Sequence, residues 1–219
     1  HIFVATPGLE FACRHDDEHP QDRCLSVRYA ESAIESLRSA GAMAASTPLL
    51  NVTNRSAYLR HELASAGGDA ARTEAIAGAL YWSLTTKAAA RRPFRPRQLS
   101  WYAARVGRAK ELMDAHYAEP LSLSQMAQEV GMSLYHFARV FGELEGEPPH
   151  QYLVRVRLRH AAARLHKGAG VTDTCYAVGF GSLSHFTTTF RRQLGVRPSE
   201  FRNRSHAPDQ RRKPRQPPA

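Results

Sequence analysis

Side chains that can hydrogen-bond to nucleotide bases recur on two segments in the second half of the chain. On the first segment, Tyr135, His136 and Arg139 share the outward face of a predicted helix. On the second, the matching face carries hydroxyls, an imidazole and an arginine: Ser184, His185, Thr188 and Arg191. Arginine can bind guanine through two hydrogen bonds, and all of these groups can bind base edges or phosphates. The chemistry that they predict is recognition of double-stranded DNA.

Cysteine and histidine side chains form a separate cluster near the start of the chain. Cys13, His15, His19 and Cys24 follow a C-x-H-x3-H-x4-C spacing, and two thiolates with two imidazoles suit tetrahedral zinc. The spacing differs from that of a zinc finger, and Cys13 and Cys24 could instead form a redox pair. Our preferred interpretation is that these are ordinary strand and loop residues, without a metal.

No arrangement typical of catalysis accompanies these clusters. The sequence shows no Ser/His/Asp constellation, phosphate-binding loop or paired carboxylates. We therefore expect a protein that is not an enzyme and has no cofactor. One alternative is a cysteine- or metal-dependent protein of DNA repair or sensing, fused to the same DNA reader, in which Cys13 or Cys24 supplies an activated thiolate. Another is an architectural protein that binds DNA without sequence preference.

A pattern of apolar residues and glycines repeats in the segment that carries the two outward faces. The first copy is Leu123, Met126, Ala127, Val130, Gly131 and Met132. It recurs 48 residues later as Val171, Thr174, Cys175, Val178, Gly179 and Phe180. A second block recurs after 49 residues, with His136, Phe137 and Phe141 matched by His185, Phe186 and Phe190. Each copy predicts a helix, a turn at a left-handed glycine and a second helix.

Caps and inward residues can be assigned in each copy. Ser122 with Gln125 forms a capping box, and Ser133 and Ser182 can cap the two second helices. The first of these second helices is expected to end near Leu144, with inward positions Leu134, Phe137, Ala138 and Phe141. The inward positions expected in the second copy are Val171, Thr174, Cys175, Val178, Leu183, Phe186, Thr187 and Phe190. Cys175 is interpreted as a small core residue at the place of Ala127.

A helix predicted over residues 151–167 separates the two copies. Its apolar stripe is Val154, Leu158, Ala161 and Leu165, and its flanking arginines are Arg155, Arg157, Arg159 and Arg164. A helix of this length is roughly 25 Å long. With the width of a helix at each end, it favours binding to two adjacent major grooves, about 34 Å apart. Arg155 is a candidate for a phosphate contact.

Charge is distributed unevenly along the 219 residues, which carry a net charge of +10. Residues 1–90 contain eight Lys/Arg and ten Asp/Glu, whereas residues 100–219 contain eighteen and ten. Only the second half is therefore expected to meet a polyanion. We predict four parts: an N-terminal region 1–90, an Arg/Pro linker 91–100, a DNA-binding domain 101–203 and a disordered basic tail 204–219.

The N-terminal region is expected to combine a few strands with helices. The predicted strands are 2–5, 9–14 and 24–29. The predicted helices are 32–39, 57–64 and 70–85, and another helix is expected over 102–118. Ile76, Leu80 and Leu84 form one stripe, which is a candidate contact surface for a homodimer.

Nothing in the sequence predicts a membrane span or a secretory signal, because the apolar runs are shorter than about 18 residues. The first residue, His1, lies inside a predicted strand, which suggests that the natural N-terminus is missing. Three cysteines without a secretory signal fit a reducing cytosol. We therefore expect a cytoplasmic protein.

The segment from about Arg105 to Arg202 resembles the DNA-binding domain of AraC/XylS-family transcription regulators. The resemblance is carried by the Leu123–Ser133 run, His136-Phe137-x-x-x-Phe141, Gln151-Tyr152-Leu153, Val178-Gly179-Phe180, Ser184-His185-Phe186-x-x-x-Phe190-Arg191 and Gly195-x-x-Pro198-x-x-Phe201-Arg202. It implies a mainly α fold, a seven-helix bundle with two helix-turn-helix units. By position, it places on DNA Tyr135, His136, Arg139, Leu183, Ser184, His185 and Thr188. It also implies sequence-specific regulation of transcription, with activation as the expected sign and RNA polymerase as a partner.

Two departures from the family pattern affect readout. Many members have arginine at the place of Thr188 and a longer polar side chain at the place of Ala138. Base readout by these two positions is therefore expected to be weaker here, and Arg139 is expected to carry more of the specificity.

A shorter resemblance covers part of the N-terminal region. Residues Phe11–Glu18, Asp22–Ser26 and Tyr29-Ala30 are similar to the late strands of the cupin-like sensor in some members of that family. This implies a truncated cupin-like α+β part, used for sensing and for dimerisation through the helices that follow. The small-molecule effector cannot be identified from these residues.

Overall fold

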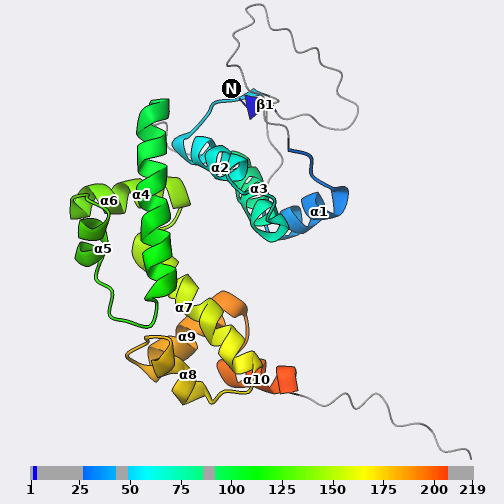
Figure 1. Ribbon diagram of the computed structural model, residues 1–219. Helices are drawn as coiled ribbons and strands as arrows, with labels where there is room; N and C mark the ends of the chain where they lie inside the picture. The colour runs from blue at the N-terminus through cyan, green and yellow to red at the C-terminus, as the bar shows by residue number, and fades with distance from the viewer. Residues whose placement is uncertain (1, 4–26, 43–48, 86–91, 207–219) are drawn as a thin grey trace, which may run out of the picture. The chain divides into compact units, whose positions relative to one another are not determined.

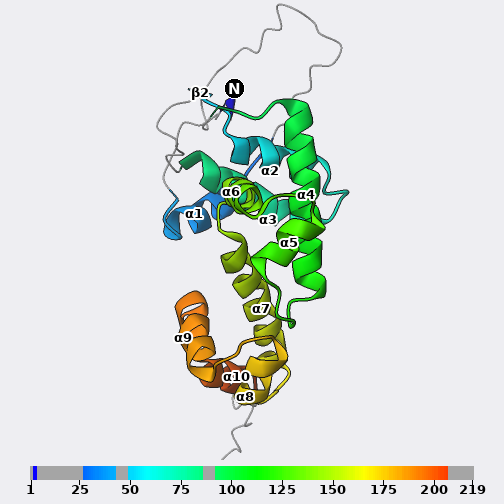
Figure 2. The same cartoon turned by 90° about the vertical axis from the view of Figure 1, so that its left-hand side faces the viewer.

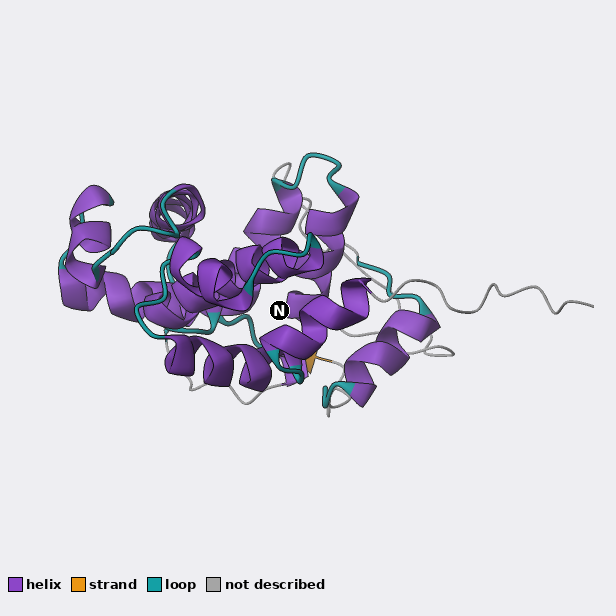
Figure 3. Cartoon of the chain, turned by 90° about the horizontal axis from the view of Figure 1, so that it is seen from below, coloured by secondary structure: helices purple, strands orange, loops and turns teal. Residues whose placement is uncertain are grey.

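The computed structural model describes residues 2–3, 27–42, 49–85 and 92–206. It divides into two compact units, residues 1–104 with 143–146 and residues 105–142 with 147–219. Helices make up almost all of the regular structure in the described residues (Figure 3). The expectation of a mainly α protein is thus confirmed.

In its described residues, the first unit holds α1 (Glu31–Ser39), α2 (Asn54–Ala64), α3 (Ala70–Thr85) and the start of α4 (Pro96–Ala115), together with the last residues of α6 (Leu134–Glu145) (Figure 1). Thr53 caps α2, because its hydroxyl accepts from the Ser56 N–H while the Ser56 hydroxyl accepts from the Thr53 N–H. α2 and α3 pack against each other, with Tyr58 buried.

The strands in the described residues are two residues long each. β1 (Ile2–Phe3), within the predicted strand 2–5, pairs antiparallel with β2 (Leu49–Leu50). The strand expected over 24–29 is wrong for residues 27–29, which have no regular structure. Two strands of two residues each do not support the expected cupin-like part. The strand predicted over 9–14 lies outside the described residues.

Tyr29 shows why its segment is not a strand. Its hydroxyl donates to the Ala77 carbonyl oxygen of α3 at 2.7 Å, and its ring lies 5.3 Å from that of Tyr81. At position 29, the apolar ring of the predicted alternation packs on a helix. Burial raises the pKa of Tyr29 to about 12.

Polar contacts hold residues 143–146 against α2 within the first unit. The Asn54 amide nitrogen donates to Glu143 Oε1 at 2.6 Å, and its oxygen accepts from the Phe94 N–H at 2.6 Å. The Tyr58 hydroxyl donates to Glu145 Oε1 at 2.6 Å. Asn54 can therefore be buried, because both ends of its amide are paired.

The second unit contains the rest of α4 and six further helices. These are α5 (Leu123–Glu129), α6 (Leu134–Glu145), α7 (Pro149–His166), α8 (Val171–Ala177), α9 (Leu183–Leu194) and α10 (Pro198–His206). α4 to α10 correspond to the seven helices expected from the resemblance. α7 runs from the end of α6 to the group formed by α8, α9 and α10 (Figure 2).

Three helix ends differ from the expected positions. α4 begins at Pro96, inside the stretch expected to be a linker, and ends at Ala115 rather than near residue 118. The fixed φ of proline suits the first turn of a helix, so Pro96 starts the helix and does not prevent it. α10 continues to His206, beyond the expected end of the domain at residue 203.

Candidate nucleic-acid interface

The two turns of the repeat have the same hydrogen-bond pattern. In the first, the Met132 N–H donates to the Ala127 carbonyl oxygen at 2.9 Å and the Gly131 N–H to that of Gln128. In the second, the Phe180 N–H donates to the Cys175 carbonyl oxygen at 3.1 Å. The glycines have φ of 65° and 85°. This is the Schellman motif twice, and it ends α5 and α8 in the same way.

The caps predicted at the two units differ in strength. Ser122 and Gln125 form the predicted capping box, with the Gln125 N–H donating to Ser122 Oγ at 3.1 Å and the Ser122 N–H to Gln125 Oε1 at 2.9 Å. Ser182 accepts from the His185 N–H at 3.4 Å, and no reciprocal bond accompanies it. The cap in the first helix-turn-helix unit therefore has two hydrogen bonds, and the cap in the second has one.

α6 exposes part of the outward face that the sequence predicted. Tyr135 is 82% exposed, whereas His136 and Arg139 are half-buried. The buried face consists of Phe137, Val140, Phe141 and Leu144. Leu134 was expected in the core but is 47% exposed. It is the first residue of α6, so no turn of that helix precedes it.

α9 presents a more polar outward face. The exposed residues are Leu183, Ser184, His185, Thr188 and Arg191. Its buried face is Phe186, Thr189 and Phe190, and Thr187 is half-buried. Leu183, expected in the core from its periodicity, is 37% exposed because it begins α9 as Leu134 begins α6.

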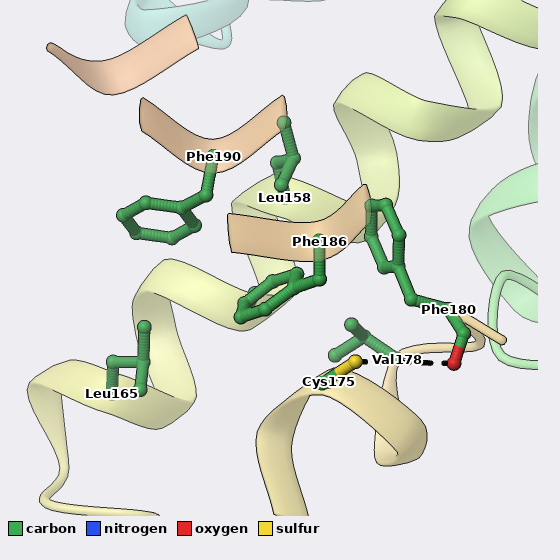
Figure 4. Close-up of a cluster of buried hydrophobic side chains, with 8 residues drawn as sticks. Leu158, Leu165, Cys175, Val178, Phe180, Phe186 and Phe190 are labelled. Atoms are coloured by element: carbon green, nitrogen blue, oxygen red, sulfur yellow. Dashed lines mark hydrogen bonds between the residues drawn. The ribbon is translucent and has the colours of Figure 1, made fainter. Parts of the chain in front are cut away.

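Buried residues of the second helix-turn-helix unit form one cluster with residues of α7 (Figure 4). Its members are Leu158, Ala161, Leu165, Cys175, Val178, Phe180, Phe186 and Phe190. The stripe predicted on the linking helix thus packs as expected, although Val154 is only half-buried. Cys175 is fully buried, and burial raises the pKa of its thiol. The prediction that Cys175 is a core residue is confirmed.

Three arginines and two threonines line a pocket of about 640 Å³ between α9 and the start of α10. Its lining comprises Val171, Thr187, Thr188, Arg191, Arg192, Arg197, Pro198 and Ser199. The three arginines are exposed, and no salt bridge joins them to a carboxylate in the described part of the chain. A pocket with these donors can hold a phosphate.

Sequence reasoning missed the contribution of Arg197 and Ser199 to this pocket. The available signal was Arg197-Pro198-Ser199, a proline-led helix start only a few residues after Arg191-Arg192.

Arg155, expected to contact phosphate, has partners within the protein. Its Nη2 lies 2.7 Å from Glu147 Oε1, and its guanidinium lies 4.6 Å from the centroid of the Tyr152 ring. The Tyr152 ring also lies 5.4 Å from that of Phe141, so this group joins α6 to α7.

The predicted cluster of Cys13, His15, His19 and Cys24 lies outside the described residues. The described residues contain no group of three or more His, Cys, Asp or Glu placed to hold a metal ion. Within the same described ranges, no helix has both the length and the hydrophobicity needed to span a membrane.

Comparison with known proteins matches the region described above. A family model described as "Helix-turn-helix domain" matches residues 126–204. The HTH-type transcriptional activator RhaS of Enterobacter sp. (strain 638) is 36% identical over 100 residues, covering 45% of this chain and 36% of that protein. The virulence regulon transcriptional activator VirF of Yersinia enterocolitica is 33% identical over 96 residues, covering 43% and 35%. The chain thus spans about a third of the length of these curated relatives.

A solved structure is similar over the same region. It is a transcriptional regulator with an AraC-type DNA-binding domain from Chromobacterium violaceum, 31% identical, covering 48% of this chain and 95% of that one with a TM-score of 0.45. Residues 126–204 thus match a helix-turn-helix domain, and this part of the chain is similar to the transcriptional activators RhaS and VirF.

Proposed function

We propose that this chain is a sequence-specific DNA-binding regulator of transcription, in which α6 and α9 read two adjacent major grooves. The observation that carries the proposal is the duplicated helix-turn-helix unit, with the same turn geometry and an outward polar face in each copy. α7, with 18 residues, is about 27 Å long. Adding the flanking helices gives a separation that suits neighbouring grooves, about 34 Å apart.

The residues proposed to read bases differ between the two helices. On α6 they are Tyr135, His136 and Arg139, with Arg139 as the donor to guanine. On α9 they are Leu183, Ser184, His185 and Thr188, and Arg191 binds phosphate. The pocket beside α9 supports this division, since Arg191 lines it together with Arg192 and Arg197.

Further parts of the proposal rest on the relatives and the resemblance. Activation is the proposed sign, because the relatives described above are named activators. RNA polymerase is the proposed partner. Ile76, Leu80 and Leu84 of α3 are proposed as a homodimer contact, and their half-burial leaves part of each side chain accessible. A cytoplasmic location and an unidentified effector complete the proposal.

A thiol-dependent repair function receives no support from the described cysteine. Cys175 is fully buried, and burial raises the pKa of its thiol, whereas a nucleophilic cysteine needs a lowered pKa and access to substrate.

Selection of bound fragments from a random DNA pool, using the full chain, tests the proposed function. The expected result is one bipartite motif, bound about 10³-fold or more tightly than random DNA. Footprinting should then show two protected grooves about one helical turn apart. An equal affinity for selected and random DNA would support the architectural alternative and contradict specific readout.

The salt dependence of binding tests the pocket separately. Arg197→Ala should weaken binding to selected and random DNA by the same factor and reduce the slope of log K against log salt by about 0.9 for one lost phosphate contact. Arg164→Ala is the matched control, an exposed arginine near the end of α7 that does not line the pocket. An unchanged slope in Arg197→Ala would contradict a phosphate in this pocket.

A further inference from the structure

The segment between α4 and α5, residues 116–119, contacts α7 and parts of the second helix-turn-helix unit. Arg157 of α7 donates from Nε to the Tyr117 carbonyl oxygen at 2.7 Å and from Nη2 to that of Glu119 at 2.8 Å. One planar guanidinium therefore binds two carbonyls of the same segment, which fixes direction as well as distance. The Arg157 side chain is half-buried.

Tyr117, in the same segment, contacts α7 and the core of the second helix-turn-helix unit. Its ring stacks on that of His160, with centroids 3.8 Å apart and planes 6° apart. It also packs against the buried cluster that contains Phe186 and Phe190 of α9. The segment that leads into α5 is thus connected to the packing beneath α9, and the outward faces make no part of this connection.

Gly179 brings the turn of the second unit against the same segment. A Cβ built at Gly179 would lie 2.7 Å from the Ala118 carbonyl oxygen and 3.0 Å from its carbon, both rigid backbone atoms. At Gly131, the equivalent position of the first unit, a Cβ would meet nothing within 4 Å. Both glycines have positive φ, so the turn conformation does not account for the difference. Of the two turns, the second has the backbone of the segment between α4 and α5 against it, and the first does not.

We propose that residues 116–119, held by Arg157, Tyr117 and Gly179, form a clamp that fixes the spacing and relative orientation of α6 and α9. Arg157 and Gly179 are then positioning residues that determine which separation of two half-sites the protein accepts. The inference rests on the proposed function, since it assigns a specificity to the same two helices. The guanidinium of Arg157 already donates to two backbone carbonyls of the protein, so its proposed role is not direct DNA contact.

Arg157→Gln tests the clamp in the full chain, with Arg164→Gln as the charge-matched control on the same helix. Binding is measured to the selected bipartite site, to versions with one or two base pairs inserted or removed between half-sites, and to each half-site alone. A rigid protein should prefer one spacing by about tenfold or more, since only that spacing allows both heads to bind together. Arg157→Gln should reduce this preference to about threefold or less and leave half-site affinities within about twofold. Arg164→Gln should retain the preference.

The glycines provide a second matched pair. Gly179→Ala and Gly131→Ala both force a side chain into a left-handed position, so both should lose some stability. Only Gly179→Ala should shift or broaden the accepted spacing, because only there does the new methyl group meet Ala118. An equal effect of the two substitutions on spacing would overturn the proposal.

A measurement without DNA separates this inference from the proposed function. Nitroxide labels are placed at Gln128→Cys and Gln193→Cys, both exposed positions, in a chain carrying Cys13→Ser, Cys24→Ser and Cys175→Ala. Spin-label distances should show a narrow distribution that broadens with Arg157→Gln and not with Arg164→Gln. An unchanged distribution with Arg157→Gln overturns the clamp, even if the protein binds its motif. A broadened distribution in a protein that selects no DNA motif supports the clamp and contradicts the proposed function.

Discussion

The two helix-turn-helix units have the same interior and different outward faces. Each interior has a phenylalanine pair, Phe137 with Phe141 and Phe186 with Phe190, whose centroids lie 5.6 Å apart in both units. Outside, α6 has Tyr135 and Arg139, whereas α9 has small hydroxyls beside a pocket lined by arginines. The fold therefore constrains the inner positions, and the outer positions have diverged. From this difference we predict that α6 makes more of the contacts to bases and that α9 makes more of the contacts to phosphates.

The largest expected effect tests whether the interiors are equivalent. Phe137 and Phe186 are both fully buried, so Phe137→Ala and Phe186→Ala should each lower the free energy of unfolding by about 3–5 kcal/mol. Denaturant titration of each variant measures the loss. A value near zero for either one would show that its unit does not depend on the shared core.

A smaller effect tests the difference between the outward faces. Arg139→Ala should cost about 1–3 kcal/mol of binding free energy and relax the preference at one base position. Thr188→Ala should cost less, because a hydroxyl has one hydrogen to donate, whereas a guanidinium can donate two hydrogen bonds to one guanine. Equilibrium binding to the selected site, and to single-base variants of it, provides both numbers. If Arg139→Ala loses the same factor on selected and random DNA, Arg139 binds phosphate and not a base.

The caps should show a difference of about 1 kcal/mol or less. Ser122→Ala removes a capping box with bonds of 2.9 and 3.1 Å and should cost about 1 kcal/mol of stability. Ser182→Ala removes one hydrogen bond of 3.4 Å and should lower the free energy of unfolding by only about a few tenths of 1 kcal/mol. Thermal unfolding of the two variants ranks them, and the reverse ranking would contradict the cap geometries described above.

The last comparison is of thiol reactivity at position 175 and at the equivalent position 127. Its substitutions should leave stability and DNA binding almost unchanged. Because burial raises the pKa of its thiol, less thiolate is present at a given pH, and the folded protein should react slowly with iodoacetamide. The measurement uses a chain with Cys13→Ser and Cys24→Ser, with the denatured chain as the reference for full reactivity. Ala127→Cys, combined with Cys175→Ala, should be equally protected, since Ala127 is 2% exposed. Fast labelling at position 127 alone would show that the two core positions are not equivalent.

Helical periodicity predicted most of the C-terminal fold. The turns at Gly131 and Gly179, the cap at Ser122 and the burial of Cys175 were all readable, because each depends on residues within one helical turn or on a local apolar stripe. Leu134 and Leu183 were misassigned to the core. Periodicity gives the apolar face of a helix, but whether a residue at its first turn is covered depends on what lies next to that turn.

By itself, the sequence determined that the helix-turn-helix unit is doubled and which sides of its helices face inward and outward. The repeat along the chain specifies the doubling, and the 3.6-residue spacing of apolar residues specifies the two sides of each helix. What the tertiary structure alone decided was how the two units are joined. The contact of Arg157 with Tyr117 spans 40 residues, and the difference between Gly131 and Gly179 appears only when Ala118 lies against one of them. Contacts of this kind depend on which backbone atoms meet after folding, and no local pattern of residue types encodes that meeting.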